Sequence, residues 1–305
     1  MSAAFLAILP IFTLIVAGCA AKRLFVKDER FWDGAEKFVY YLFFPALLIL
    51  DITDAEFVMQ DVSRGVGVTI ASTLIIALLI FAVQLFAKSK NDTFTSIFQG
   101  GIRYNSYIFI ALSNDLFGTA GVALSGIFIA YMIVITNVLS VIVLNRYGSK
   151  TKKNFAGVLL SLIKNPLILS VIIALFLNAL DFRFSGAARQ TVTYFAAVAT
   201  PLSLMSVGAG LMFILQTDKT FAVIYSVTLK LIAMPITAAI LLNLLNLQGT
   251  TAAIALLYCT LPCAANSYIL SKQMGGDSVT MASIITWSTI ASAVTIPVVF
   301  WVVGV

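Results

Sequence analysis

The chain has 305 residues, of which 61% are hydrophobic and only 10% charged, and its mean hydropathy is +1.03. A soluble globular domain is about half apolar and about a quarter charged, so this composition excludes that class and indicates a protein embedded in lipid. The formal net charge of +6 does not indicate nucleic-acid binding, because the basic residues lie between apolar segments rather than in one patch.

About 20 apolar residues cross a bilayer, and by that measure the sequence predicts ten membrane-spanning helices. In chain order they cover 3–21, 36–52, 62–86, 94–116, 119–145, 157–180, 188–215, 220–246, 250–272 and 279–303. Residues 16–19, Val-Ala-Gly-Cys, resemble a lipoprotein processing site, but no positive charge precedes them and we expect a retained first helix. The predicted class is an all-α integral membrane protein.

Positive charge orients these spans. If the link after the first span is cytoplasmic, that side receives fourteen basic residues and the other side receives three, Arg64, Arg183 and Arg189. The fourteen are Lys22, Arg23, Lys27, Arg30, Lys37, Lys88, Lys90, Arg146, Lys150, Lys152, Lys153, Lys164, Lys219 and Lys272. This asymmetry predicts that both termini lie on the non-cytoplasmic side of the cell (inner) membrane.

An internal repeat divides the chain. The tetrapeptide Asn-Ser-Tyr-Ile occurs at 105–108 and again at 266–269, and the prolines at 10 and 166, like those at 45 and 201, are 156 residues apart. We therefore expect two five-helix repeats, 1–150 and 151–305. Five is an odd number, so the second repeat would enter the membrane upside down relative to the first.

Both tetrapeptides fall in the fourth span of their repeat, just after a signal that breaks helices. Gly100 and Gly101 precede the first copy and Pro262 precedes the second. Irregular backbone at mid-membrane depth must be buried or line a cavity, so spans four and nine are expected to break, cross and form a substrate site. Half-helix N-termini there would favour anions.

Candidate binding residues lie around these breaks. Asn105 and Asn266 can hydrogen-bond a carboxyl group without adding charge, and Ser106 and Ser267 adjoin them. The alternative is that these side chains only join neighbouring helices, and Tyr107 and Tyr268 are expected to pack rather than bind.

Two basic residues lie deep in their spans. Arg103 is about nine residues into span four and Lys230 about ten into span eight, where a charge costs about 2.5–3.5 kcal/mol. An anionic substrate, an acidic partner, or extension of the side chain toward the surface could offset that cost. For Lys230 the acidic partner could be Asp51 or Asp115, although both lie near the outer ends of their spans. No Asp or Glu lies in the middle of a predicted span, where proton and sodium carriers usually place them. A sodium ion could still bind backbone carbonyls and hydroxyls at the breaks, and a proton could travel on the substrate's own carboxyl group, so symport, antiport and uniport all remain open.

The residues give little support to other functional classes of protein. There is no His, no phosphate-binding loop and no Gly-x-Ser-x-Gly motif, so neither an enzyme nor a resident metal or cofactor is expected. The three cysteines, Cys19, Cys259 and Cys263, lie in apolar segments and are expected to be small core residues. A channel or a receptor-like sensor on the same scaffold is a further alternative, although no selectivity filter or ring of charge is evident.

Several segments resemble the auxin efflux carrier family. They are Phe43–Leu48, Asn165–Leu167, Ala199–Leu204 with Gly208 and Gly210, Leu261–Tyr268 and Gly275–Asp277. The resemblance covers essentially the whole chain, and the short link near 147–156 favours the bacterial type, whose members carry organic anions such as malonate and malate. Span four departs from the family pattern because it has two glycines and no proline.

The resemblance implies a scaffold from spans 1, 2, 6 and 7, a moving unit from spans 3–5 and 8–10, and a homodimer. The family's crossover asparagines correspond to Asn105 and Asn266. The sequence thus predicts a secondary transporter of a small organic anion, working by alternating access. The nearest rival, a sodium-coupled bile-acid-type symporter, would be expected to carry Glu and Gln at the crossover, where this chain has only Gln99 and Gln273 near the span ends.

Overall fold

The computed structural model describes residues 2–56, 59–87, 89–149, 157, 160, 163–214 and 216–303. Over these residues the regular structure is entirely helical, as the composition predicts. Five stretches are long and apolar enough to cross a membrane: Asp61–Phe86, Asn91–Tyr147, Gly186–Ala209, Thr217–Leu244 and Ser278–Val303. The boundary expected between the two repeats, at 150/151, lies outside the described residues.

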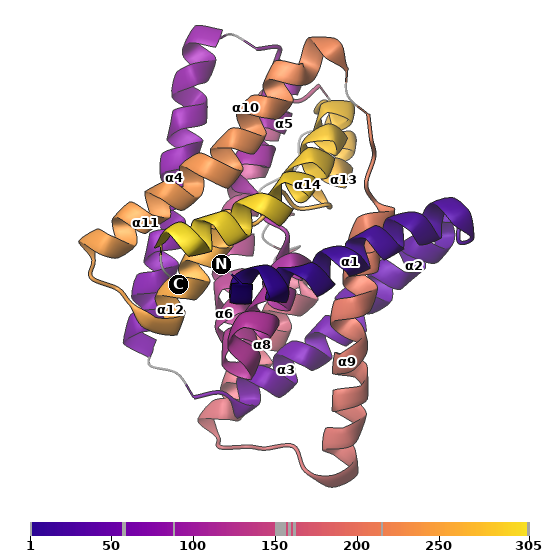
Figure 1. Cartoon of the computed structure of the whole chain (residues 1–305), viewed down its shortest axis with the longest axis vertical. Coiled ribbons are helices and arrows are strands. Elements are labelled where there is room, and N and C mark those ends of the chain that lie inside the picture. The colour runs from indigo at the N-terminus through magenta and orange to yellow at the C-terminus, as the bar shows by residue number, and fades with distance from the viewer. Residues whose placement is uncertain are drawn as a thin grey trace.

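The helices pack in two groups (Figure 1). In the first group α1 packs along α9, and α3 packs against both α8 and α9. This group contains α1 (Ser2–Leu24), α2 (Glu29–Phe38), the π-helical turn η1 (Val39–Phe43), α3 (Phe44–Asp54), α8 (Pro166–Ala179) and α9 (Gly186–Ala209). It forms the lower right part of Figure 1.

The second group fills the upper and left part of the same view. Here α4 packs against α11 and α12, while α5 packs against α10 and α14. The members are α4 (Met59–Ala87), α5 (Asn91–Ile102), η2 (Thr217–Lys219), α10 (Thr220–Thr228), the π-helical turn η3 (Leu229–Ala233), α11 (Met234–Leu244), α12 (Gly249–Thr260), α13 (Ser267–Met274) and α14 (Ser278–Val303). The remaining helix, α6 (Ser106–Tyr147), contacts both groups.

Each π-helical turn lies just before a proline. Pro45 follows η1 and Pro235 follows η3, and proline cannot donate the usual backbone hydrogen bond and its ring clashes with the carbonyl four residues earlier. The residue before each proline donates five residues back instead, Phe44 to Val39 and Met234 to Leu229. The wider turn lets the two long helical stretches, α2–η1–α3 and α10–η3–α11, continue through a proline.

The helix α6 folds back on itself at Gly118, whose φ of 62° and ψ of −152° are not helical. A side chain at Gly121 would overlap the carbonyl oxygen of Ser113, although eight residues of straight helix would separate the two by about 12 Å. The chain therefore reverses near Gly118, which is where the sequence predicts the link between spans four and five. Glycine suits the position because other residues rarely adopt a positive φ.

Polar contacts join the helices at both ends of the molecule. Arg189, near the start of α9, forms an ion pair with Asp54 at the end of α3, with 2.7 Å between Nη2 and Oδ2. Nearby, the Asn178 amide donates to the carbonyl oxygens of Ile52, Thr53 and Ala55 at 2.9–3.2 Å. These contacts fix the end of α3 against α8 and α9.

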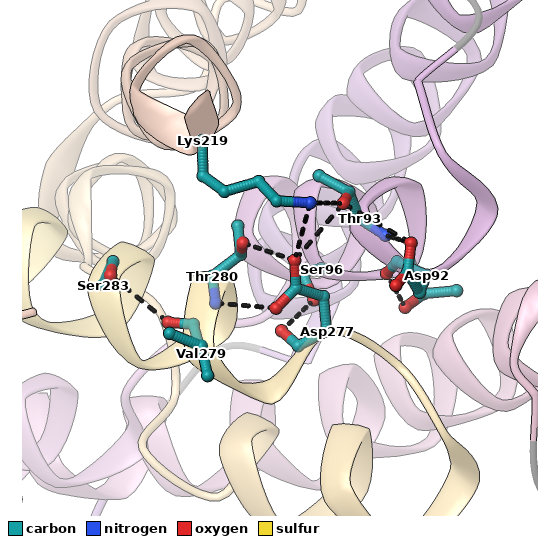
Figure 2. A network of polar contacts seen from close by, with 9 residues as sticks. Asp92, Thr93, Ser96, Lys219, Asp277, Val279, Thr280 and Ser283 are labelled. Atoms are coloured by element: carbon teal, nitrogen blue, oxygen red, sulfur yellow. Dashed lines mark hydrogen bonds and ion pairs between the residues drawn. The ribbon is translucent and has the colours of Figure 1, made fainter. Parts of the chain in front are cut away.

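At the opposite end, Asp277 joins three segments that are distant in sequence (Figure 2). Its carboxylate lies 3.3 Å from Lys219 Nζ, and it accepts from the Thr280 hydroxyl at 2.6 Å and from the Thr280 N–H at 3.0 Å, which caps α14. Lys219 also donates to Thr93 at the start of α5, at 2.7 Å, and the Ser96 hydroxyl donates to the Asp277 carbonyl oxygen. We call these residues with Asp92 the Asp277 junction.

Candidate functional site

Two helix breaks meet near the centre of the molecule. The first separates α5, which ends at Ile102, from α6, which begins at Ser106, and the second separates α12, which ends at Thr260, from α13, which begins at Ser267. The backbone N–H of Asn105 donates to the carbonyl oxygen of Pro262 at 2.9 Å. The two breaks are thus in direct contact, and each satisfies a backbone group that the other leaves unpaired.

The glycines expected to break span four are helical. Gly100 and Gly101 belong to the last turn of α5, and the chain leaves the helix only at Arg103. A side chain at Gly100 would overlap Ser226 and Ile284, and one at Gly101 would overlap Ile80. The prediction is therefore corrected: these glycines allow α5 to pack closely against its neighbours, whereas Pro262 does lie inside the second break.

A cavity of about 470 Å³ adjoins these two breaks, between the two groups of helices. The first group contributes residues from α2, η1 and α8, the two breaks contribute residues that include Arg103 and Asn266, and α6 contributes a further part of the wall. Its polar lining residues are Asp33, Glu36, Lys37, Tyr40, Tyr41, Arg103, Tyr104, Asn105, Ser106, Tyr107, Thr136, Asn137, Asn165 and Asn266. The cavity includes four of the six predicted binding residues: Arg103, Asn105, Ser106 and Asn266.

Arg103 is the central charged group of this cavity. Its side chain is only 6% exposed, and its two terminal nitrogens donate to Asn137 Oδ1 at 2.8 Å and to Asn266 Oδ1 at 2.9 Å. Its Nε has no hydrogen-bond partner, and no carboxylate of the described residues lies within 4.0 Å of the guanidinium. A buried cation held only by neutral amides lacks the counter-charge that would offset its desolvation.

The two asparagines of the repeated tetrapeptide do different work. The Asn105 side chain accepts from the backbone N–H groups of Tyr107 and Ile108, at 3.0 and 3.2 Å, and so caps α6. Its Nδ2 is buried without a partner. Asn266 makes no such cap to α13 and accepts from Arg103 instead. The two asparagines of the repeated tetrapeptide therefore make different contacts.

The remaining predicted binding residues, Ser106, Ser267 and Lys230, differ in whether they reach the cavity. Ser106 lines the cavity, but Ser267 is fully buried and faces the sulfur of Cys263 at 3.7 Å. Lys230 is also fully buried, with Nζ 3.0 Å from the Met234 sulfur and 5.4 Å from the centre of the Tyr258 ring. Neither Ser267 nor Lys230 contributes to the cavity wall.

Sequence reasoning missed two groups in the cavity. Asn137 holds Arg103 from the part of α6 beyond the Gly118 reversal, and its signal is an amide beside Thr136 inside an otherwise apolar span. Glu36 is the first residue of the second predicted span, 36–52, and so lies outside the span centres. The structure places it in the cavity wall, so the absence of acidic residues from span centres did not exclude one from the site.

A second cavity, of about 220 Å³, lies beside the first between α1, α2, α9, α13 and α14. Both cavities are lined by Asp33, Glu36, Tyr107, Ala265, Asn266 and Ile269. The second cavity also includes Lys22 and Glu29, which form an ion pair at 3.6 Å. Together the cavities form a polar region along the boundary between the two groups of helices.

The chemistry of the larger cavity suits an anion. A guanidinium binds a planar carboxylate through paired N–H groups, and the Arg103 side chain is held in place by two amides. The α6 helix begins at this wall, where its N-terminus carries partial positive charge.

The chain is similar to known membrane transport proteins. A family model described as "Membrane transport protein" matches residues 3–300. A curated protein of Rhizobium meliloti (strain 1021), named "Putative malonate transporter", is 24% identical over 306 residues, which cover 95% of this chain and 92% of that protein. These matches confirm the predicted resemblance and indicate a transporter rather than an enzyme. The chain belongs to the membrane transport protein family, that of the auxin efflux carriers, and is a multi-pass membrane protein.

Proposed function

We propose that the protein is a secondary transporter that moves a small organic anion across the cell membrane by alternating access. The single observation that carries the proposal is the environment of Arg103. Its guanidinium lies in the wall of a cavity of about 470 Å³, held by Asn137 and Asn266, without a carboxylate partner among the described residues. An anionic substrate would supply the missing counter-charge.

The substrate class follows from the size and polarity of the cavity. Amides, hydroxyls and tyrosines surround Arg103, which suits a short mono- or dicarboxylate of the malonate or malate type better than a bulky apolar acid. The name of the Rhizobium relative supports the same class. Asn105, Asn266 and Ser106 would orient the carboxyl groups, while Ser267 and Lys230 would support the crossing from behind.

We infer ten membrane crossings in two inverted repeats, 1–150 and 151–305, with the broken helices α5–α6 and α12–α13 crossing at the site. The reversal at Gly118 supports this count, because it divides Asn91–Tyr147 into two crossings. The polar contacts of Asp54 and of Asp277 support the predicted sides, because each joins links that charge assigns to one face. Both termini would then lie outside the cytoplasm.

The two groups of helices supply the moving parts of the mechanism. Because the cavity lies between them, sliding the second group against the first would expose Arg103 and Asn266 to one side of the membrane and then to the other. From the family resemblance we propose that the first group forms a static scaffold in a homodimer.

Purified protein provides the test. Malonate, malate, acetate and an uncharged amide analogue would be compared by thermal shift, with and without sodium, at two pH values. We expect the anions alone to raise the melting temperature, and Arg103→Gln to abolish that rise while leaving the protein folded. Asn266→Ala should also abolish binding because it removes one of the two acceptors that hold Arg103. If Arg103→Gln lost the binding of neutral and anionic compounds equally, or still bound the anions, the proposal would be refuted.

A further inference from the structure

The carboxylate of Glu36 occupies an unusual position. It lies on α2, in the first group of helices, and lines both the larger and the smaller cavity. The side chain is half-buried, whereas Asp33, one turn earlier on the same face, is exposed. Glu36 therefore faces the substrate region from the scaffold side, across from Arg103 and Asn266 in the second group.

Glu36 has no fixed counter-charge among the described residues. The other charged groups of the larger cavity are Asp33, Lys37 and Arg103, and those of the smaller cavity are Lys22, Glu29 and Asp33. Lys22 is paired with Glu29, and Arg103 is held by the two amides. Within the described part of the chain, no basic group lies within 4.0 Å of the Glu36 carboxylate.

Among the described residues that line the two cavities, the remaining titratable groups are tyrosines. Tyr40 and Tyr41 come from η1, Tyr104 and Tyr107 from the first break and α6, and Tyr268 from α13. The helix that packs along α2, α9, contributes only Ser206, Val207 and Ala209, with Gly210 at its end. Tyrosine has an ordinary pKa near 10, so a proton exchanged near neutral pH must reside on a carboxylate.

An anion that enters this cavity meets Glu36 as a second negative charge. Two carboxylates that share a partly buried site do not both remain ionised, because each raises the free energy of the other's charged form. We propose that Glu36 binds one proton when the organic anion binds, so that anion and proton cross the membrane together. The proton leaves the solvent on the entry side, adds to the Glu36 carboxylate, and returns to the solvent on the exit side.

The location of the two sites on different groups supplies the coupling. The anion site lies mainly on the second group and the proton site on the first, so any sliding between the groups changes their separation. Proton affinity then depends on whether the anion is present, and by linkage anion affinity depends on pH to the same extent. This inference rests on the proposed function and identifies its coupling ion.

The test compares malonate uptake by the whole protein in proteoliposomes with pH 6 or pH 8 outside and pH 8 inside. We expect wild-type uptake to be driven by the inward proton gradient and Glu36→Gln to show equal uptake with and without the gradient. Because malonate itself titrates identically in the wild-type and Glu36→Gln samples, the difference in uptake between them reports the Glu36 side chain alone. Glu56→Gln is the matched control, because this glutamate is exposed and lines neither cavity.

Calorimetry gives a second reading, of proton uptake on binding, that does not depend on transport. Malonate binding in two buffers of different ionisation enthalpy should show more proton uptake for wild type than for Glu36→Gln or Glu36→Asp in the range where Glu36 titrates. Gradient-driven uptake by Glu36→Gln equal to wild type would overturn the proposal for Glu36 and leave the carrier function standing. Failure of the wild type to bind or move any carboxylate would overturn both.

Discussion

Replacing Asp277 with alanine should destabilise the protein by about 2.5–4 kcal/mol. Two losses add to this figure. The carboxylate caps α14 by accepting from the Thr280 N–H at 3.0 Å, and such caps contribute about 1 kcal/mol. It also neutralises Lys219, whose Nζ lies 3.3 Å away, and hydrogen bonds to charged groups contribute about 1.5–3 kcal/mol. Both side chains are largely buried, at 16% and 11% exposed, so solvent screens the pair only weakly.

Asp277→Asn separates the two contributions. Asparagine keeps an acceptor for the cap but loses the charge, so we expect about half the destabilisation of Asp277→Ala. Lys219→Met, combined with Asp277→Asn, should recover part of that loss because no buried ammonium is then left without a carboxylate. Melting temperatures of purified protein would measure this, at about 2 °C per kcal/mol for a large chain.

The same junction predicts a pH dependence. Burial by itself would raise the pKa of Asp277, but the hydrogen bonds from Thr280 and the ammonium of Lys219 outweigh it and hold the pKa below its ordinary value. A carboxylate with a depressed folded pKa stabilises the protein above its unfolded pKa of about 3.9, and the stabilisation is lost as pH falls through the folded pKa. The difference between wild type and Asp277→Asn should thus be constant from pH 7 to about pH 5, begin to shrink near pH 4, and disappear once the pH lies below the folded pKa. A difference that grows on acidification, or no difference at pH 7, would refute this reasoning.

Further substitutions test the packing and the site. Gly208→Ala should destabilise by at least about 1–3 kcal/mol, because the new side chain overlaps the Ile15 carbonyl oxygen of α1, whereas Gly67→Ala, which meets nothing within 4 Å, should be neutral in the same melting assay. Lys230→Met should match or exceed the wild-type melting temperature, since it removes a fully buried charge that has no acidic partner among the described residues. Marked destabilisation by this variant would indicate that Lys230 forms an ion pair in another conformation of the protein. Asn105→Ala should cost about 1 kcal/mol as a lost cap of α6, while Asn105→Asp should keep the stability but weaken malonate binding by placing a negative charge beside Arg103; unchanged binding by the latter would place the anion elsewhere.

The sequence alone determined that the protein lies in a membrane, that its structure is helical, and to which family it belongs. Hydropathy is a sum over residues, so it identifies a membrane protein without any knowledge of packing. Pro262 and the repeated Asn-Ser-Tyr-Ile marked where helices break, because proline and asparagine act on the local backbone. The Gly100–Gly101 pair misled for the same reason: a glycine that breaks a helix and one that permits close packing look identical in a sequence.

Only the tertiary structure decided which polar groups face the site. Helices such as α4, α6 and α14 are apolar all round, because lipid and protein interior both accept apolar side chains, and their sequences therefore do not indicate which face points inward. Asn137 meets Arg103 because α6 reverses at Gly118, and Glu36 reaches the cavity because α2 lies along the boundary between the two groups. The same packing buries Lys230 away from the cavity, although its depth in span eight matched that of Arg103 in span four. Depth in the membrane follows from counting residues, whereas facing depends on how each helix is rotated against its neighbours, and that rotation is fixed by contacts between segments distant in the chain.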